Sequence, residues 1–477
     1  MGSTRKAFLY AFISSNGTTV LSFISSLVIA RLLSPAEIGI YSISVAFIGV
    51  TQILRDFGAT NYIIQSQSIT RDILRSAFGS MLLLAWLLAG VLWMSASAIS
   101  AFYSEPRLQE LLHILSLNLL LTPMGAVTIA LLRRNMRFGT IGLIDVTSTA
   151  VQSIVSCFLA WRGLGATSLA WGALSGLITT ILLSLAHRQP EQSWLPGISH
   201  LREILGFGSY ATSASLLGHL NISAADLLLG RLADSQAVGL FSRGISLARL
   251  LTTILMRGVN PVIGPLFAKL RRGEGDAELT FRNAAVQLTV LTWPALAFTA
   301  AFSEQIIHIL FGSQWIASAP LVPFICVSTA IGIPFTMVSQ VLLGSGKPRF
   351  WLKIEAMNLP IKLAAVFFAA PFGLTSVAAS FSIVALCGAT YQLHILKKHM
   401  GFRSIPLLRS WIPSLAVGLC CWLVFIGVRT VFQAHLSSFT LLVVAGIVGI
   451  PAWLAMVWLL RHPVWSEVRR LLALRTP

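Results

Sequence analysis

The chain has 477 residues, of which 56% are hydrophobic and only 10% charged, and its mean hydropathy is +0.81. Soluble domains carry about 25% charged residues, so this composition excludes a soluble protein and predicts a polytopic membrane protein. The formal charge of +18 does not indicate nucleic-acid binding, because the basic residues lie in short loops between apolar segments.

The apolar segments predict an all-α integral membrane protein. The first of them, residues 7–30, is too long for the hydrophobic part of a signal peptide and is expected to stay as a spanning helix. A spanning helix needs about 20 apolar residues. Fourteen segments meet this requirement: residues 8–30, 38–65, 76–101, 110–132, 140–161, 165–186, 204–230, 238–266, 281–302, 318–343, 350–370, 374–396, 410–430 and 438–460.

The distribution of basic residues predicts the orientation. Fourteen spans place both termini on one side of the membrane, and most of the 34 Lys and Arg residues then fall on that side. The opposite side receives only Arg31, Arg107, Arg162, Arg231 and Arg429. Because short cytoplasmic loops carry the excess of Lys and Arg, both termini of this multi-pass protein are predicted to be cytoplasmic.

One motif occurs twice in the chain. Residues 31–42 read RLLSPAEIGIYS, and residues 231–242 read RLADSQAVGLFS, with Arg, Leu, Gly and Ser aligned without a gap. Weaker matches follow in the same order, between Arg137-Phe138 and Arg349-Phe350 and between Gly163-Leu164 and Gly373-Leu374. Spans 1–6 therefore echo spans 7–12.

The repeat predicts two pseudo-symmetric lobes of six helices each. Six is an even number, so both lobes enter from the same side and the repeats are parallel, as in some secondary transporters. The predicted domains are an N-terminal lobe at residues 1–186, a cytoplasmic linker at 187–203 and a C-terminal lobe at 204–400. Residues 401–477 hold two additional spans and a cytoplasmic tail.

No enzyme motif is present in the sequence. Residues 344–348 (GSGKP) lack the remaining residues of a phosphate-binding loop and are predicted to form a turn. The nine His residues show no paired-ligand spacing, so we predict no catalytic residue, no metal site and no cofactor. Residues 304–319 are too polar to span and are expected to lie along the outer interface, with Trp315 at the level of the headgroups.

Charged side chains inside predicted spans are the main functional signal. A charge at the bilayer centre costs at least about 2.5–3.5 kcal/mol, so it usually faces a water-filled cavity or a partner. The cations of this kind are Arg55, Arg243, Arg249, Arg257 and Lys362. The three arginines of residues 238–266 fall within roughly a 120° arc of one helix, which fits either a cavity lining or side chains that reach the headgroups or pair with acids.

The acids inside the spans are fewer. Asp56, Asp145 and Asp226 are expected either to pair with these arginines or to bind a coupling proton or sodium ion. A cavity with this excess of cations favours an anion, and arginine offers bidentate donors to phosphate. Polar residues of the first span, between Asn16 and Ser26, fit helix packing or contacts to sugar hydroxyls.

The repeated motif, together with Arg55-Asp56-Phe57-Gly58 and the segment ILFGSQW at 309–315, resembles bacterial polysaccharide flippases of the Wzx type. These belong to the multidrug/oligosaccharidyl-lipid/polysaccharide (MOP) exporter superfamily. The resemblance implies a MATE-like fold around a cavity lined by spans 1, 2, 7 and 8, with alternating access. It implies flipping of an undecaprenyl-pyrophosphate-linked oligosaccharide for surface polysaccharide synthesis, with a polymerase and other assembly proteins as partners beside the lipid bilayer.

Two other functions remain open at this point. A MATE-like drug or cation antiporter of the same fold would use Asp56 or Asp226 to bind the cation. A membrane-embedded glycosyltransferase or polymerase would need clustered acids or a large external loop, and the sequence contains neither.

Overall fold

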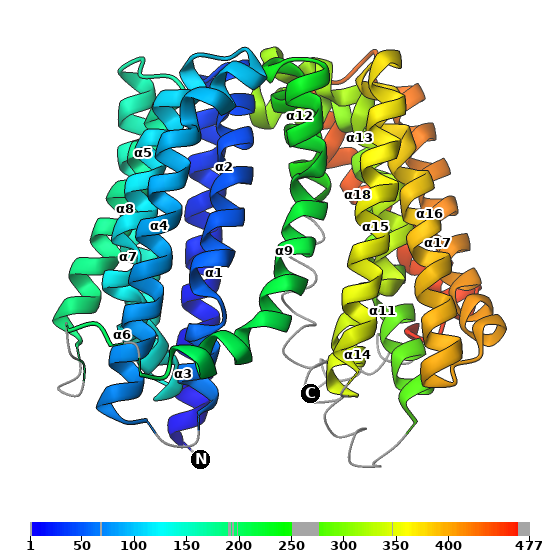
Figure 1. Ribbon diagram of the computed structural model, residues 1–477. Coiled ribbons are helices and arrows are strands. Elements are labelled where there is room, and N and C mark those ends of the chain that lie inside the picture. The colour runs from blue at the N-terminus through cyan, green and yellow to red at the C-terminus, as the bar shows by residue number, and fades with distance from the viewer. Residues whose placement is uncertain are drawn as a thin grey trace. The chain divides into compact units, whose positions relative to one another are not determined.

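The computed structural model describes residues 2–66, 69–188, 192, 195–197, 199–249, 276–345 and 347–465. Its contacts divide the chain into two compact units, Met1–Gly239 and Leu240–Pro477, called unit 1 and unit 2 below. Within the described ranges, the regular secondary structure is helical in both units (Figure 1).

Unit 1 is a bundle of long helices joined by short turns. Its helices are α1 (Gly2–Leu32), α2 (Pro35–Asp56), α3 (Ala59–Gln65), α4 (Arg71–Tyr103), α5 (Arg107–Leu121), α6 (Pro123–Arg134), α7 (Phe138–Trp161), α8 (Thr167–Ala186) and α9 (Leu201–Leu232). A further helix begins at residue 235 and is described as far as residue 249, so it crosses the boundary between the units in the sequence.

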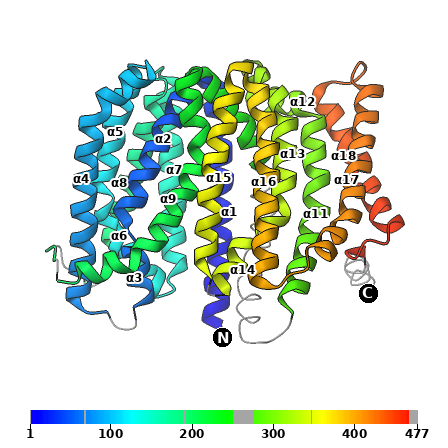
Figure 2. The ribbon, with the colours of Figure 1, turned by 45° about the vertical axis from the view of Figure 1, so that its right-hand side comes forward.

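Unit 2 continues with a second set of helices. They are α11 (Ala277–Ala301), α12 (Ser303–Phe311), η1 (Ser313–Leu321), α13 (Val322–Gly332), η2 (Ile333–Phe335), α14 (Val338–Gly344), α15 (Pro348–Ala369), η3 (Ala370–Phe372), α16 (Leu374–Met400), α17 (Ser404–Phe432) and α18 (Ser438–Leu459). Helix α17 packs against both α11 and α18, and these three run side by side (Figure 2).

Ten described helices are long and apolar enough to cross a membrane, or eleven if the bent pair α5 and α6 counts as one span. This pair is bent by 51° at Pro123, whose ring and missing N–H prevent a continuous helix. A multi-pass membrane protein is thereby confirmed. The total of fourteen spans stays a prediction, because most of the predicted span 238–266 lies outside the described residues.

The predicted span 38–65 is wrong as a single helix. Helix α2 ends at Asp56, and α3 begins at Ala59 after two residues with positive φ, Phe57 at 35° and Gly58 at 79°. A left-handed residue ends a helix, and glycine tolerates this conformation without a steric penalty.

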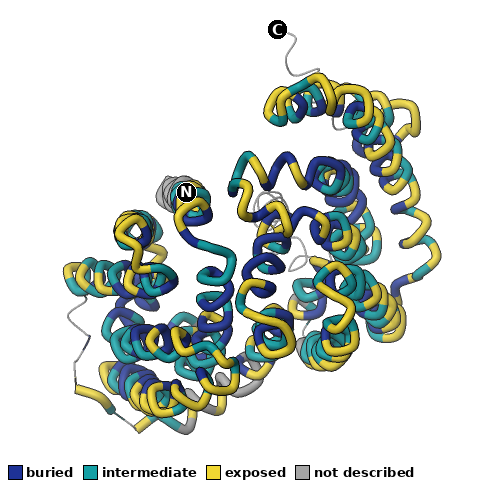
Figure 3. Tube along the Cα trace, turned by 90° about the horizontal axis from the view of Figure 1, so that it is seen from above, coloured by how far each residue is buried: buried dark blue, intermediate teal, exposed yellow. Residues whose placement is uncertain are grey.

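The exposed residues fit a lipid environment. Large apolar side chains remain exposed along the helices, for example Leu83 and Leu87 at 56% each and Met94 at 84% on α4. Seen along the helix axes, exposed positions follow the outer surface of the helices and buried positions their inner faces (Figure 3). Exposed apolar area of this extent is typical of a surface in contact with lipid.

The repeated motif marks two equivalent helix starts. Ser34 caps α2: its Oγ accepts from the Glu37 N–H at 3.4 Å, and the Glu37 carboxylate accepts from the Ser34 N–H at 2.7 Å. At the second copy, the Asp234 carboxylate accepts from the Ala237 N–H at 2.6 Å. Ser and Asp are preferred caps because their oxygens satisfy free N–H groups of the first turn.

The glycines of the two motif copies make reciprocal contacts. A Cβ atom at Gly39 would overlap the carbonyl of Ser235, and a Cβ atom at Gly239 would overlap the carbonyl of Pro35. All four residues belong to unit 1. The helices that start at 35 and 235 therefore cross at the smallest separation their backbones allow, in a locally two-fold arrangement, which we call the glycine crossing.

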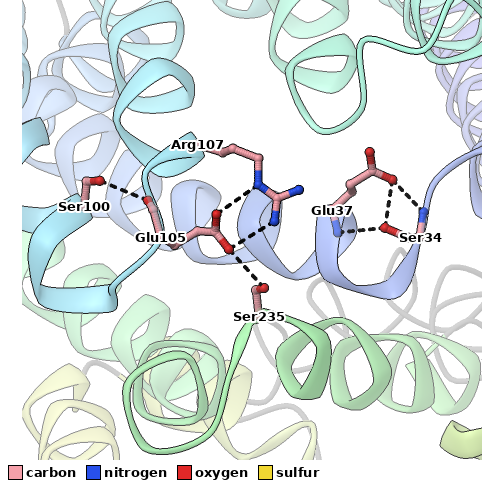
Figure 4. Close-up of polar contacts among 6 residues, drawn as sticks. All are labelled: Ser34, Glu37, Ser100, Glu105, Arg107 and Ser235. Carbon is pink, nitrogen blue, oxygen red and sulfur yellow. Dashed lines mark hydrogen bonds and ion pairs between the residues drawn. The ribbon is translucent and has the colours of Figure 1, made fainter.

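A polar cluster lies beside this crossing (Figure 4). Arg107 donates from Nε and Nη2 to the two carboxylate oxygens of Glu105, at 2.9 and 3.2 Å. The Ser235 hydroxyl donates to the same carboxylate at 3.3 Å. These contacts join the α4–α5 turn to the start of the helix at 235.

Helix α9 packs on α2, with further contacts to α3 and α4. The contacts therefore group α9 with the first eight helices, although the predicted division places residues 204–230 in the C-terminal lobe. The division into two lobes of six helices stays a prediction. Local equivalence supports the repeat at one more position, where Gly163 and Gly373 have φ values of 85° and 91°.

Candidate functional site

Unit 1 contains a cavity of about 720 Å³. Residues of α2, α3, α5, α7, α8 and α9 surround it. Most of its polar lining residues are amides and hydroxyls: Tyr41, Gln52, Asn61, Asn118, Thr122, Ser148, Gln152, Thr180, Thr212 and Ser215. His219 also borders it, and the charged lining residues are Arg55 and Asp56. A volume of this order matches the pockets that hold organic ligands.

Close packing of helices positions these groups. A Cβ atom at Gly49 would overlap the ring of His219, so the absence of a side chain lets α9 approach α2. The His219 Nε2 atom lies 3.0 Å from the carbonyl oxygen of Ala46. On α8, Gly172 and Gly176 similarly admit α7, which places Gln152 of α7 at the cavity wall. Small residues commonly permit this approach between membrane helices.

Arg55 lies at the C-terminal end of α2 and borders the cavity. Its Nε and Nη1 atoms are buried and have no hydrogen-bond partner among the described residues. Neither Asp56 nor any other described acid forms an ion pair with it. A buried guanidinium group without a partner costs free energy, and an anion in the cavity would remove that cost.

Asp56 follows Arg55 but points to a different partner. Its carboxylate accepts a hydrogen bond from the Thr60 hydroxyl at 2.5 Å, across the break between α2 and α3. Adjacent helical residues are about 100° apart around the axis, which explains why the two charges do not meet. Arg55 and Asp56 therefore border the same cavity without forming an ion pair with each other.

Arg243 has different surroundings. It is 7% exposed, and its guanidinium carbon lies 4.6 Å from the centroid of the Phe311 ring and 4.7 Å from that of Trp315. Trp315 itself is 0% exposed, so the expectation that it anchors the outer interface at the headgroups is wrong. Its ring serves as a packing surface for a cation inside unit 2.

The other predicted cations lie apart from this cavity. The Lys362 ammonium group is 4.8 Å from the centroid of the Phe381 ring in unit 2. Arg249 is exposed at the last described position of its helix. Arg257 lies outside the described residues, so its predicted place in the cavity stays a prediction.

The predicted acids are also separated. Asp145 is exposed on α7, and Asp226 is half-buried on α9; neither borders the cavity, whereas Asp56 does. None of the polar residues between Asn16 and Ser26 of α1 borders it. Ser25 of α1 faces α7, where its hydroxyl lies 3.7 Å from the Cys157 sulfur, which supports the packing interpretation for this position.

Sequence reasoning missed the neutral residues of the cavity. Gln52, Asn118, Gln152 and His219 all lie within predicted spans, where an amide or imidazole is nearly as unusual as a charge. A search for polar residues in these spans, and not only charged ones, would have found them. Their convergence on one cavity depends on helix packing, which the sequence alone does not give.

Unit 2 has a cavity of about 490 Å³ with different chemistry. It is lined almost entirely by apolar residues of α11, α12, α17 and α18, including Phe298, Phe425 and Ile450. The Trp453 indole donates to the Val290 carbonyl at 2.9 Å and so satisfies its own N–H group. None of the described residues that line this second cavity is charged.

With both cavities described, comparison with known proteins decides the family. A family model described as polysaccharide biosynthesis protein matches residues 28–320, more than half of the chain. The chain belongs to this family. Membership follows from the family model alone, and the relatives and solved structures below describe what the chain is similar to.

Two curated relatives agree with this family assignment. The lipopolysaccharide biosynthesis protein WzxC of Escherichia coli K12 is 22% identical over 94% of this chain and 92% of its own length. The succinoglycan biosynthesis transport protein ExoT of Rhizobium meliloti is 22% identical over 92% of this chain and 89% of its own.

The fold resembles that of the lipid II flippase MurJ in its inward closed conformation. The TM-score is 0.77 at 14% identity, over 94% of this chain and 98% of that one. An inward-facing MATE transporter of the MOP superfamily gives a TM-score of 0.60 at 16% identity, over 82% of this chain and 96% of its own. The expected MATE-like fold class is thereby confirmed, while the exact helix count stays open.

Proposed function

We propose that this polysaccharide biosynthesis protein flips an undecaprenyl-pyrophosphate-linked oligosaccharide across the bacterial inner membrane by alternating access. The glycan would serve a surface polysaccharide, and a polymerase would take it up on the far side. The relatives whose names refer to lipopolysaccharide and succinoglycan biosynthesis support this class of substrate.

The observation that supports this proposal most directly is the environment of the Arg55 side chain. Two of its buried guanidinium nitrogens lack a hydrogen-bond partner among the described residues, and the side chain borders a 720 Å³ cavity. Phosphate oxygens are the groups that arginine binds best, through two parallel hydrogen bonds. A hydrogen bond to a charged group is worth about 1.5–3 kcal/mol, so Arg55 would provide a substantial part of the affinity for the pyrophosphate.

The proposed topology places this arginine where loading begins. Arg55 and α3 lie at the same end of unit 1 as the start of α1 (Figure 1). We propose fourteen spans in two parallel lobes of six, with two additional helices and cytoplasmic termini, because the basic loops fit that orientation. Arg55 would then meet a headgroup that arrives from the cytoplasmic leaflet.

The remaining predicted residues receive separate roles in this proposal. Arg249 and Arg257 would supply further contacts to the anion at other stages of transport. Arg243 and Lys362 lie over aromatic rings, which supports a packing role. Asp145 and Asp226 remain candidates for pairing or ion coupling.

Complementation of a strain that lacks the gene tests the proposal. Arg55→Ala should fail to restore the surface polysaccharide while reaching the membrane in normal amount. Arg137→Ala is the matched control, because it removes the same side chain from an exposed position just before α7. Full restoration by Arg55→Ala would refute the role of this arginine.

A cation antiporter is the second candidate function, because the Asp56 carboxylate borders the same cavity. An antiporter would need this carboxylate to bind a proton, a sodium ion or a cationic drug. Ion-driven efflux of a cationic dye from vesicles, abolished in Asp56→Asn, would favour that function. A flippase predicts no such efflux.

A further inference from the structure

Carboxamide side chains border the unit 1 cavity without hydrogen-bonding to the described part of the protein. Asn118 is only 5% exposed, yet its side chain has no hydrogen bond to any described residue. Gln152 and Gln52 border the same cavity with exposed side chains, and their amides also lack hydrogen-bond partners in the described part of the chain. Because these amides face the cavity, water or a polar ligand inside it must satisfy their donors and acceptors.

Three of the hydroxyl groups that border the cavity are already used. Thr122 Oγ1 donates to the Asn118 carbonyl at 2.5 Å, Ser148 Oγ to the Asp145 carbonyl at 3.2 Å and Thr180 Oγ1 to the Gly176 carbonyl at 3.1 Å. Their donors therefore serve the helix backbone. The amides, together with the other hydroxyls of the lining, remain as groups that offer both donors and acceptors to a ligand.

The charges and the amides lie at different depths. Arg55 and Asp56 end α2, whereas Asn118 lies in α5 and Gln152 beyond the middle of α7. With a rise of 1.5 Å per residue, the two amides are roughly 10–15 Å from Arg55 along the helix axes. The charges and these two amides could therefore meet different parts of one elongated ligand.

We propose that Asn118 and Gln152 form a subsite for uncharged sugar, while Arg55 holds the phosphate. The inference rests on the proposed function and specifies its substrate: the sugar next to the lipid phosphate is neutral. The charged residues of the described lining are Arg55 and Asp56, and the basic group near this depth is the imidazole of His219, beside Ala46 of α2. A uronic acid there would therefore lose its hydration without gaining a guanidinium or ammonium counter-charge. Carboxamides, in contrast, hydrogen-bond sugar hydroxyls without any charge.

Binding to the purified full-length protein in lipid nanodiscs tests this division. Three probes are compared: undecaprenyl pyrophosphate alone, the same lipid with a neutral disaccharide, and the same lipid with a uronic-acid disaccharide. The wild type should bind the neutral glycolipid about 10-fold more tightly than the bare lipid. Replacing both amides, Asn118→Ala with Gln152→Ala, should remove this gain and leave the affinity for the bare lipid unchanged.

Two controls separate the subsite from general damage. Asn135→Ala removes an amide from an exposed position after α6 and should leave all three affinities unchanged. Asn118→Asp, which keeps the shape, should weaken the uronic-acid glycolipid more than the neutral one. This second variant keeps the test valid if the double variant unfolds.

The outcomes distinguish the subsite from the flippase function itself. Tighter binding of the uronic-acid probe by the wild type, or an equal loss for bare and neutral lipids in the amide variants, would overturn the sugar subsite. Absence of binding to undecaprenyl pyrophosphate, or binding that Arg55→Gln leaves unchanged, would instead overturn the proposed function.

Discussion

Arg55 and Arg243 are both arginines inside apolar helices, but the two units treat them in opposite ways. Arg55 borders a polar cavity in unit 1, and two of its buried nitrogens have no partner among the described residues. Arg243 is enclosed in unit 2 between the rings of Phe311 and Trp315, at 4.6 and 4.7 Å. In unit 1 the guanidinium group of Arg55 is available to a ligand. In unit 2 the guanidinium group of Arg243 packs against aromatic rings.

The difference teaches that a charge in a predicted span has two distinct explanations. Face-on contact with aromatic rings stabilises a desolvated cation by about 2 kcal/mol or more. A cavity stabilises the cation only when water or an anion fills it. Substitutions should therefore separate stability from transport at these two positions.

The largest expected effect is on stability, from Arg243→Ala. The change removes two ring contacts and leaves a void beside Phe311 and Trp315, so the free energy of unfolding should fall by about 2–4 kcal/mol. Thermal unfolding in detergent and the amount of folded protein in the membrane measure this. An unchanged Tm would mean that the ring contacts contribute nothing and would break the comparison.

Arg55→Ala should show the reverse pattern. Affinity for undecaprenyl pyrophosphate should fall about 10- to 100-fold, equivalent to roughly 1.4–2.8 kcal/mol. The Tm should stay the same or rise, because the substitution removes a buried charge without a described partner. Binding and unfolding measured on the same preparation test both parts, and a large drop in Tm would contradict the second.

The lysine variants sharpen the contrast with a smaller effect. Arg55→Lys keeps a point charge for the phosphate and should retain partial transport, with about a 10-fold loss of affinity from the missing bidentate geometry. Arg243→Lys loses the planar group that stacks on Phe311 and Trp315 and should cost about 1–2 kcal/mol of stability without a specific loss of binding. Equal transport defects in both variants would argue against separate roles.

The smallest expected effect is a pH dependence in unit 2 that leaves binding at Arg55 untouched. His462 is buried after α18, where its Nδ1 accepts from the Val464 N–H at 3.3 Å and its Nε2 lies 3.0 Å from the Ser414 hydroxyl. Burial lowers the pKa of this imidazole below its ordinary value of 6.5. The unfolded chain therefore binds more protons as the pH falls below about 6.5, and stability decreases there.

Between pH 7.5 and 5.5, this histidine should lower the Tm by about 1–2 °C. The variant His462→Phe cannot bind that proton, so its Tm should vary less over the same range. An identical pH dependence in both proteins would show that other groups cause it.

Much of the fold was predictable because hydropathy records which segments are in lipid. The sequence predicted an all-helical multi-pass protein of the MATE-like class, and ten or eleven of the described helices can span a membrane. It also predicted that residues 31–42 and 231–242 correspond, and both copies begin a helix with a side-chain cap. Caps and apolar runs are local signals, which a sequence displays directly.

The site was less predictable because its contacts join residues far apart in the chain. Arg55 was identified as a cation in a span, but Asn118 and Gln152 were not, since their meeting depends on how α5 and α7 pack. The aromatic partners of Arg243 are about 70 residues away, in a segment expected at the interface. The break after Asp56 was also missed, because Phe57 is an unusual residue for positive φ.

The glycine crossing has a practical consequence for hybrid transporters. Gly39 and Gly239 each fit against the backbone of the other motif copy, so neither position tolerates a side chain while its counterpart keeps its place. A chimera that joins the first 200 residues of this chain to the remainder of a relative can fold correctly only if the donor supplies glycine where Gly239 stands. The choice of fusion partner is therefore limited first by the need for a residue without a Cβ atom at this position. The sugar that each transporter carries matters only after that.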